Sequence, residues 1–438
     1  MEVSLMDILN ARDSRAQRQR ELLCRFGKPL ICFTMNIAGP EKVTPLVREG
    51  FSLGRELLSA QLAGLPILLQ EDRTADTGCE LMLVVDADAT ALKKITAQIE
   101  DTFPIGRLFD MDVLAPGGAK LSRKDLGLPE RTCLLCGNPA YLCSRSRAHS
   151  VLQLQEKTTR LLTDAIRRKR SKAIAAMAQK ALLYEVCVTP KPGLVDRNNS
   201  GSHRDMDIFT FMSSTAALGS YFESCAMVGF SEPDAQAAFR QLRFHGRNAD
   251  DAMHRATGGV NTHKGAIFTL GLLSCAAAWA GNDIDSLLSR CEDMTVGLTA
   301  RDMSGITPES ARTNGQKLFA KYGITGIRGE AEAGFPTVAN AGLPTLEKAL
   351  DAGLSPDEAG CSALLAILAA ADDTNLISRS SRETQLRIRQ EVAALLQRSP
   401  DRQTLSELDR AFIRDDLSPG GSADLLAASW FLHFLKEA

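Results

Sequence analysis

The composition of the chain changes between residues 150 and 175. Before this region, β-like runs alternate with helix-like segments, and a polar, arginine-rich helix is expected over residues 6–26. After it, β-branched clusters become scarce, and alanine, leucine and polar helix formers dominate. A chain of 438 residues is also too long for one ordinary core. We therefore predict an α+β domain over residues 1–165 and an all-α domain over residues 166–438.

The overall charge and the cysteine usage restrict the class of protein. The formal net charge is only −2, so no global field would draw the chain to nucleic acid or to anionic lipid. The basic run Arg167–Lys172 is interpreted as a solvated helical connector, with a nucleic-acid patch as the alternative. The first residues lack the pattern of a signal peptide, and the apolar run Ala266–Ala280 is too short to span a bilayer. With 11 scattered cysteines, we expect reduced thiols and a cytoplasmic location. Because the net charge is close to zero, anionic ligands must be bound by local basic groups, and we expect small phosphorylated substrates and no membrane partner.

Three strands are expected in the first domain, over residues 30–36, 80–85 and 107–114. On the last of these, Asp110 and Asp112 would point to the same face, because side chains alternate along a strand. Two carboxylates on one face repel each other unless a cation lies between them, and hard oxygen ligands suit Mg²⁺. Since nucleotidyl-transfer sites are commonly built in this way, we expect a nucleotidyltransferase-like fold. The alternative is a solvent-facing acidic edge.

A second cluster follows at residues 131–150. Cys133, Cys136, Cys143 and His149 would supply four zinc ligands, and the first two have the spacing of a zinc knuckle. The alternative is a small core of reduced cysteines with Arg145, Arg147 and His149 facing phosphate. The sequence contains no second Cys-x-x-Cys motif, so both interpretations remain open.

Taken together, these two clusters resemble the apo-citrate lyase phosphoribosyl-dephospho-CoA transferases over roughly the first 150 residues. The matching segments are Gly106–Val113, Arg131–Cys136 and Cys143–His149, with weaker similarity at Ala11–Arg15 and Asn36–Lys42. The resemblance implies transfer of a phosphoribosyl-dephospho-CoA group to a serine of the acyl-carrier (gamma) subunit of citrate lyase, with release of pyrophosphate. Asp110 and Asp112 would then hold Mg²⁺, and Arg107, Arg145 and Arg147 would meet the triphosphate.

Two polar loops dominate the second domain. The first, residues 185–207, has two prolines and two glycines and is rich in polar groups, which favours a binding site over a solvated connector. Its candidate residues are Lys191, Asp196, Asn198, His203, Asp205 and Asp207. The second loop, Gly258–Gly265, precedes an apolar helix and contains Asn261, His263 and Lys264. Small residues at a helix start expose backbone N–H groups, so this loop is a candidate phosphate cradle, although no Walker A motif is present.

These loops resemble those of the triphosphoribosyl-dephospho-CoA synthases, and the similarity extends over nearly all of the second domain. It is strongest at Pro190–Asp196, Gly201–Asp207, Gly259–Gly265 and Ser418–Asp424. The resemblance implies that ATP and 3′-dephospho-CoA react to give a triphosphoribosyl product and free adenine. Asp196 or His203 would be the base, with His263 as the next candidate. Asp205 and Asp207 would hold a metal ion, and Lys191 and Lys264 would share the phosphate charge.

The two resemblances fit together, because the expected product of the second domain is the substrate of the first. The sequence therefore predicts a fused bifunctional transferase that builds the citrate lyase prosthetic group and attaches it. One alternative is the same chemistry serving malonate decarboxylase. Another is a zinc-stabilised binding module fused to a nucleotide N-glycosyl hydrolase.

Overall fold

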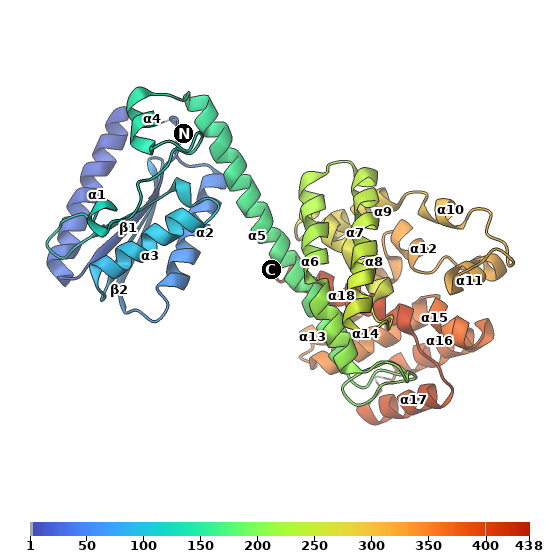
Figure 1. Ribbon diagram of the computed structural model, residues 1–438. Helices are drawn as coiled ribbons and strands as arrows, with labels where there is room; N and C mark the ends of the chain where they lie inside the picture. The colour runs from blue at the N-terminus through green and yellow to red at the C-terminus, as the bar shows by residue number, and fades with distance from the viewer. Residues whose placement is uncertain (1–2, 399) are drawn as a thin grey trace. The chain divides into compact units, whose positions relative to one another are not determined.

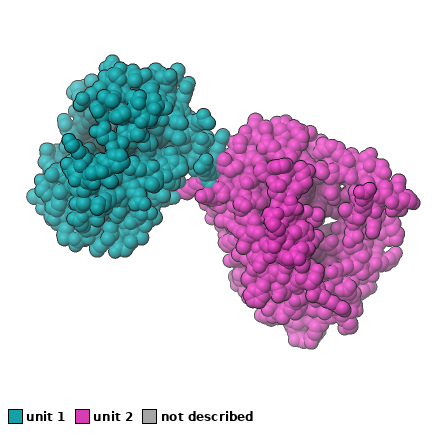
Figure 2. All heavy atoms as spheres, in the orientation of Figure 1, with its two compact units in different colours: residues 1–168 teal, residues 169–438 magenta. Residues whose placement is uncertain are grey.

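The computed structural model describes residues 3–398 and 400–438. Its contacts divide the chain into two compact units, Met1–Arg168 and Lys169–Ala438, here called unit 1 and unit 2 (Figure 2). The division falls within the region where the composition changes. Helix α5, Val151–Cys187, runs without a break from one unit into the other (Figure 1). The described part of the chain is mostly helical, and all of its strands belong to unit 1.

Unit 1 is built on a four-stranded antiparallel sheet with the order β2-β3-β1-β4. The strands are β1 Leu30–Met35, β2 Ile67–Ala75, β3 Gly78–Val85 and β4 Phe109–Leu114. The sequence predicts β1, β3 and β4 but not β2. Most side chains of β2 are exposed, because it forms an edge of the sheet. An edge strand with little burial lacks the hydrophobic alternation by which strands are recognised.

Helices cover both faces of the sheet (Figure 1). On one face, apolar side chains such as Phe33 and Met111 pack with α2, Pro45–Gln61, and α3, Ala89–Thr102. On the other face, Cys32 packs with Leu22 of α1, Leu5–Phe26. The core beneath α1 is the smaller of the two, so the α1 face of the sheet retains room for polar groups.

The segment between β4 and α5 contains little regular structure. Its elements are a 3-10 turn, Lys124–Leu126, and the short helix α4, Ala140–Ser146. None of residues 115–150 is buried, although Leu134 packs against the larger apolar core as a partly buried side chain. This segment therefore has no hydrophobic core of its own.

Unit 2 is all-helical over its described residues. Its helices after α5 are α6 Ile208–Ser231, α7 Ala235–Ala256, α8 Lys264–Ala280, α9 Ile284–Thr295, α10 Leu298–Met303, α11 Asn314–Tyr322, α12 Ile327–Glu332, α13 Leu343–Asp351, α14 Pro356–Ala370, α15 Thr374–Arg379, α16 Arg382–Leu396, α17 Arg402–Arg414 and α18 Gly420–Lys436, with a π-helical turn at Val338–Gly342. One large hydrophobic core unites them, and Trp430 is among its largest buried side chains. The prediction of an all-α second domain is confirmed.

Helix α8 lies at the centre of this core. It is apolar on nearly all sides, and most of its residues from Ala266 to Ala277 are buried. Such a helix satisfies its backbone internally and needs apolar neighbours on every side. The prediction of a buried helix at this position is confirmed. Among the described helices, none combines the length and the apolar character that crossing a membrane requires.

Candidate active sites

The acidic pair of unit 1 lies on the α1 face of the sheet. Burial alternates along β4, and Asp110 and Asp112 are half-buried between fully buried apolar neighbours. Asp112 is paired in register with Cys32 of β1, which places both acids on the face that α1 covers. The shared face predicted from the sequence is confirmed. Each acid has one basic partner: Arg131 is 3.1 Å from Asp110, and Lys120 is 2.6 Å from Asp112.

The ionisation of Asp110 is unfavourable in this position. Burial raises the pKa of its carboxyl group, the negative charge of Asp112 raises it further, and Arg131 and Lys120 oppose the shift. Nearby, Arg15 of α1 forms an ion pair with Glu80 of β3. Two carboxylates that destabilise each other in this way form a site at which a divalent cation would be favoured. The sequence did not identify Arg131 or Arg15 as partners, because these contacts join segments far apart in the chain.

The three arginines predicted to meet the triphosphate have different surroundings. Arg107 lies in the 3-10 turn Gly106–Leu108 before β4 and donates a hydrogen bond to the carbonyl of Thr132. Its Nε and Nη1 are buried and have no hydrogen-bond partner among the described residues. Burial lowers its pKa, and the neighbouring Arg131 adds to this effect. Arg145 and Arg147 are exposed, the first on α4 and the second just after it. Only Arg107 is therefore held next to the strand that carries the acidic pair.

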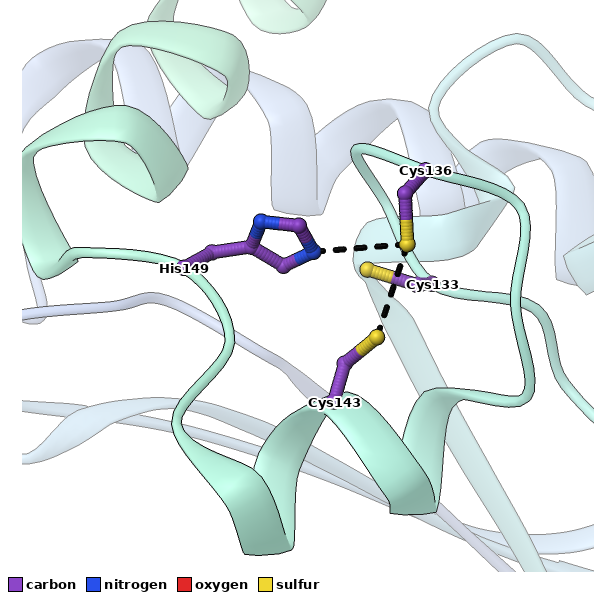
Figure 3. Close-up of side chains that lie close together, drawn as sticks. All are labelled: Cys133, Cys136, Cys143 and His149. Atoms are coloured by element: carbon purple, nitrogen blue, oxygen red, sulfur yellow. Dashed lines mark hydrogen bonds between the residues drawn. The ribbon is translucent and has the colours of Figure 1, made fainter.

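Cys133, Cys136, Cys143 and His149 form a compact cluster (Figure 3). Their sulfur and nitrogen atoms all lie within 4.8 Å of one another. Cys133 and Cys136 belong to a short turn, Cys143 to α4, and His149 to the link before α5. The three cysteines are free thiols. The structure thus brings together all four side chains that the sequence offers as zinc ligands.

Unit 2 contains a cavity of about 910 Å³. It is lined by residues from both predicted loops and from α15, α16 and the start of α18. The predicted residues that line it are Lys191, His203, Asp205, Asn261, His263 and Lys264. Segments separated by more than 200 residues in the sequence therefore meet at one site.

Asp196 and Asp207 are predicted site residues that do not line this cavity. Asp196 is buried, and its carboxylate accepts hydrogen bonds from the backbone N–H groups of Lys191, Asn198 and Asn199 at 2.6–3.0 Å. Asp207 is the N-cap of α6 and forms a capping box with Thr210. The first acid shapes the loop and the second begins the helix, which are structural uses for both carboxylates.

His203 and Lys191 are tied to other polar groups of the cavity. Nε2 of His203 is 2.8 Å from the hydroxyl of Ser418, and burial together with the charge of Arg379 lowers its pKa. Lys191 is fully buried and forms an ion pair with Glu185. Burial raises the pKa of Glu185, and Lys191 opposes that shift. A buried ion pair in a cavity wall keeps a charged amine in a fixed position.

His263 is the most distinctive group in the cavity. It is 2% exposed, and its Nδ1 lies 2.7 Å from the hydroxyl of Ser214. Its Nε2 has no hydrogen-bond partner among the described residues. Burial, with a contribution from the charge of Lys191, lowers its pKa to about 3. The imidazole is therefore neutral at physiological pH, with one ring nitrogen available.

Two acids that the sequence did not single out also line the cavity. Asp424 of α18 is half-buried, and desolvation of its carboxyl group together with the charges of Glu185 and Asp373 raises its pKa well above the usual value. Asp373 accepts hydrogen bonds from the N–H groups of Asn375, Leu376 and Ser422. The segment Ser418–Asp424 was recognised from the sequence, but polar residues at helix starts are so common that Asp424 was assigned no role.

Basic groups line the same cavity. Arg379, Arg382 and Arg389 all contribute to its wall, and the last two form ion pairs with Asp372 at 2.9 and 3.1 Å. Helices α8 and α18 both begin at the cavity. The residue before each helix provides no side-chain cap, but at α18 the carboxylate of Asp373 accepts a hydrogen bond from the N–H of Ser422. Arginines beside helix starts form an environment suited to phosphate oxygens.

The two units match two protein families. Residues 3–165 match CitX, apo-citrate lyase phosphoribosyl-dephospho-CoA transferase, and residues 171–438 match CitG, ATP:dephospho-CoA triphosphoribosyl transferase. Protein CitXG of Haemophilus influenzae is 35% identical, with 99% of this chain and 96% of that protein covered. Protein CitXG of Leuconostoc mesenteroides subsp. cremoris is 33% identical, covering 98% and 97%. A 2-(5''-triphosphoribosyl)-3'-dephosphocoenzyme-A synthase of Pectobacterium atrosepticum is 41% identical, covering 58% of this chain and 86% of that protein.

Proposed function

Because this chain belongs to the family of fused CitX–CitG proteins, we propose that it performs two consecutive transfers at two separate sites. Unit 2 is a triphosphoribosyl-dephospho-CoA synthase, which uses ATP and 3′-dephospho-CoA and releases adenine. Unit 1 is an apo-citrate lyase phosphoribosyl-dephospho-CoA transferase, which modifies a serine of the acyl-carrier subunit and releases pyrophosphate. The assignment of each reaction to particular residues is developed below.

The observation that carries the synthase assignment is the meeting of cationic and neutral titratable groups in one cavity. Arg379, Arg382 and Lys264 line it together with the starts of α8 and α18, and these groups would hold the triphosphate of ATP. Such binding leaves the phosphates intact, because the bond to be broken joins C1′ of the ribose to adenine. Because no bond between phosphates is broken, a Walker A motif is unnecessary.

We assign the proton transfers to two groups whose pKa values are shifted in opposite directions. Neutral His263, with its free Nε2, would accept the proton of the attacking 2′-hydroxyl of dephospho-CoA. Asp424, whose pKa is raised by desolvation and by neighbouring carboxylates, would give a proton to the departing adenine. The new bond joins the 2′-oxygen to C1′ as the bond to adenine breaks. Nearby carboxylates such as Glu185 would stabilise positive charge on the ribose.

The bases named from the sequence remain predictions. Asp196 already accepts three backbone hydrogen bonds, and His203 already contacts Ser418 and Arg379. His263 is the better candidate because its Nε2 lacks such a partner. Magnesium at Asp205 and Asp207 likewise remains a prediction, in which Asp205 lines the cavity and Asp207 caps α6.

In unit 1, we propose that Asp110 and Asp112 hold Mg²⁺. Their shared face, their partial exposure and the raised pKa of Asp110 fit a divalent cation. When bound, Mg²⁺ would draw negative charge from the departing pyrophosphate. Arg131, held 3.1 Å from Asp110, and the neighbouring Arg107 would orient the phosphates of the donor. In support of a nucleotidyltransferase-like fold, this acidic pair lies on a central antiparallel sheet.

The test begins with the pure protein, ATP, Mg²⁺ and 3′-dephospho-CoA, followed by mass spectrometry of the products. We expect free adenine and a triphosphoribosyl adduct. Addition of the apo acyl-carrier subunit should then increase the mass of that subunit by one phosphoribosyl-dephospho-CoA group. Adenine release that does not require dephospho-CoA would instead indicate a nucleotide hydrolase. The carrier of malonate decarboxylase, offered in parallel, tests the partner.

A further inference from the structure

We propose that Cys133, Cys136, Cys143 and His149 bind one Zn²⁺ ion, which orders residues 115–150 and thereby positions Arg131 beside Asp110. The zinc site rests on geometry alone. Its effect on group transfer rests on the function proposed above for unit 1. The ion would be structural, because four protein ligands leave no open coordination position.

The distances within the cluster fit a tetrahedral site. The sulfur of Cys136 is 3.4 Å from the sulfur of Cys143 and 3.4 Å from Nε2 of His149. Zinc–sulfur bonds of about 2.3 Å and zinc–nitrogen bonds of about 2.0 Å place neighbouring ligand atoms roughly 3.5–3.8 Å apart. The ligand atoms point toward one another, as Figure 3 shows. Only small movements would therefore be needed to receive the ion.

The backbone around the first two cysteines has the form of a metal-binding turn. Thr132 and Pro139 form an antiparallel bridge across it, and Gly137 has a φ of 75°, which favours glycine. The N–H of Leu135 lies 3.5 Å from the sulfur of Cys133 and points to it. Such an N–H donor stabilises a thiolate, the form of cysteine that binds zinc.

Residues 115–150 have no hydrophobic core of their own, so a bound metal ion would be needed to stabilise their fold. None of residues 115–150 is buried, so apolar packing contributes little to the folding of this segment. A bound zinc ion links distant ligands and supplies folding free energy directly. A disulfide between Cys136 and Cys143 would be the other cross-link available. It would not explain why Cys133 and His149 converge on the same point.

The cluster connects directly to the acidic pair. Arg131 and Thr132 immediately precede Cys133. Arg131 contacts the carboxylate of Asp110, and the carbonyl of Thr132 accepts a hydrogen bond from Arg107. An ordered turn therefore holds Arg131 and Arg107 in place. Without zinc the turn would be free to move, and both arginines would lose a positional constraint.

The first measurement is the metal content of the full-length protein, purified without chelators from zinc-supplemented cells. We expect one zinc per chain in the wild type and in Cys24→Ser, which changes an exposed cysteine of α1 outside the cluster. Cys136→Ser and Cys143→Ser should lose the metal, whereas His149→Cys, which keeps four ligands, should retain it. Replacement by Co²⁺ should give the absorption of a tetrahedral thiolate complex.

The second measurement separates this inference from the proposed function. Cys136→Ser should lose transfer to the acyl-carrier subunit while adenine release continues, which shows that unit 2 of the variant is folded. The circular dichroism of the variant should match that of the wild type, which shows that unit 1 keeps its sheet. A wild-type protein without zinc, or with a Cys136–Cys143 disulfide in its place, would overturn the proposal. Undiminished zinc in both serine variants would overturn it as well. If zinc is present but neither reaction occurs, the zinc site stands and the proposed function fails.

Discussion

The carboxyl group of Asp110 lies where its ionised form is disfavoured. Burial and the charge of Asp112 raise its pKa, and the neighbouring basic groups offset only part of this effect. A side chain whose ionised form is disfavoured in the folded state makes the protein less stable at neutral pH. Such a cost is typical of residues whose role is binding rather than packing.

We therefore expect Asp110→Asn to reduce transfer to the acyl-carrier subunit by about 100-fold or more, the effect usual for a group that stabilises charge in a transition state. Adenine release by unit 2 should be unchanged. The assay supplies ready-made triphosphoribosyl-dephospho-CoA and follows the mass of the carrier. Asp76→Asn, at the exposed turn between β2 and β3, is the matched control and should keep full activity. Loss of both reactions in Asp110→Asn would contradict separate sites.

His263 makes a prediction about stability and pH. Its pKa is about 3 in the folded protein, against 6.5 for an ordinary histidine. Because the unfolded chain takes up the proton first, stability is lost as the pH falls below about 6.5, by about 1.4 kcal/mol per pH unit from this residue. Denaturant unfolding at several pH values should show a shallower decline for His263→Gln than for the wild type. An unchanged slope would show that His263 is not buried as a neutral group.

The control for this experiment is His245→Gln on α7, because that side chain is half-buried and is not among the residues that line the cavity. It should reproduce the pH dependence of the wild type. His263→Gln should also lose adenine release, whereas His245→Gln should retain it.

At the scale of elements, the start of α8 is packed against α18 through a glycine. A side-chain carbon on Gly265 would lie 1.9 Å from a carboxylate oxygen of Asp424. Gly265→Ala should therefore displace Asp424 and reduce adenine release, with little effect on transfer from supplied triphosphoribosyl-dephospho-CoA. Gly315→Ala in α11, where the added carbon would meet nothing within 4 Å, is the matched control. Equal adenine release by both variants would rule out a role for this contact.

The elements also show what sequence reasoning can reach. The apolar runs of β1 and β3 and the alternating apolar residues of β4 are buried, and they predict these three strands. Strand β2 is not predicted, because its exposed residues carry no such signal. In the same way, α8 was recognised from its apolar composition. Hydrophobic patterns in the sequence indicate which residues are buried, and they do not predict a strand whose residues are mostly exposed.

The candidate sites were predictable to a different extent. The glycine-rich loop Gly258–Gly265 supplied His263 and Lys264, since polar groups in such loops often have a binding role. Arg382 and Arg389 lie on α16, where basic residues are common on exposed faces, so nothing in the sequence marked them as cavity residues. Only the packing of α16 against its neighbours brings them to the cavity.

At the scale of the whole molecule, the two sites belong to different compact units and share no residue. The expected product of unit 2 carries phosphate groups and is the substrate of unit 1. A second site on the same chain raises the local concentration of such an intermediate but does not require that it remain bound.

This separation predicts complementation between defective chains. Asp110→Asn should make the triphosphoribosyl intermediate but fail to transfer it, and His263→Gln should do the reverse. A mixture of the two proteins with ATP, Mg²⁺, dephospho-CoA and the apo acyl-carrier subunit should therefore restore modification of the carrier. The time course should show a lag that shortens as the concentration of the His263→Gln chain rises, because the intermediate must diffuse between chains. A mixture that forms adenine but never modifies the carrier would show that the intermediate passes only within one chain.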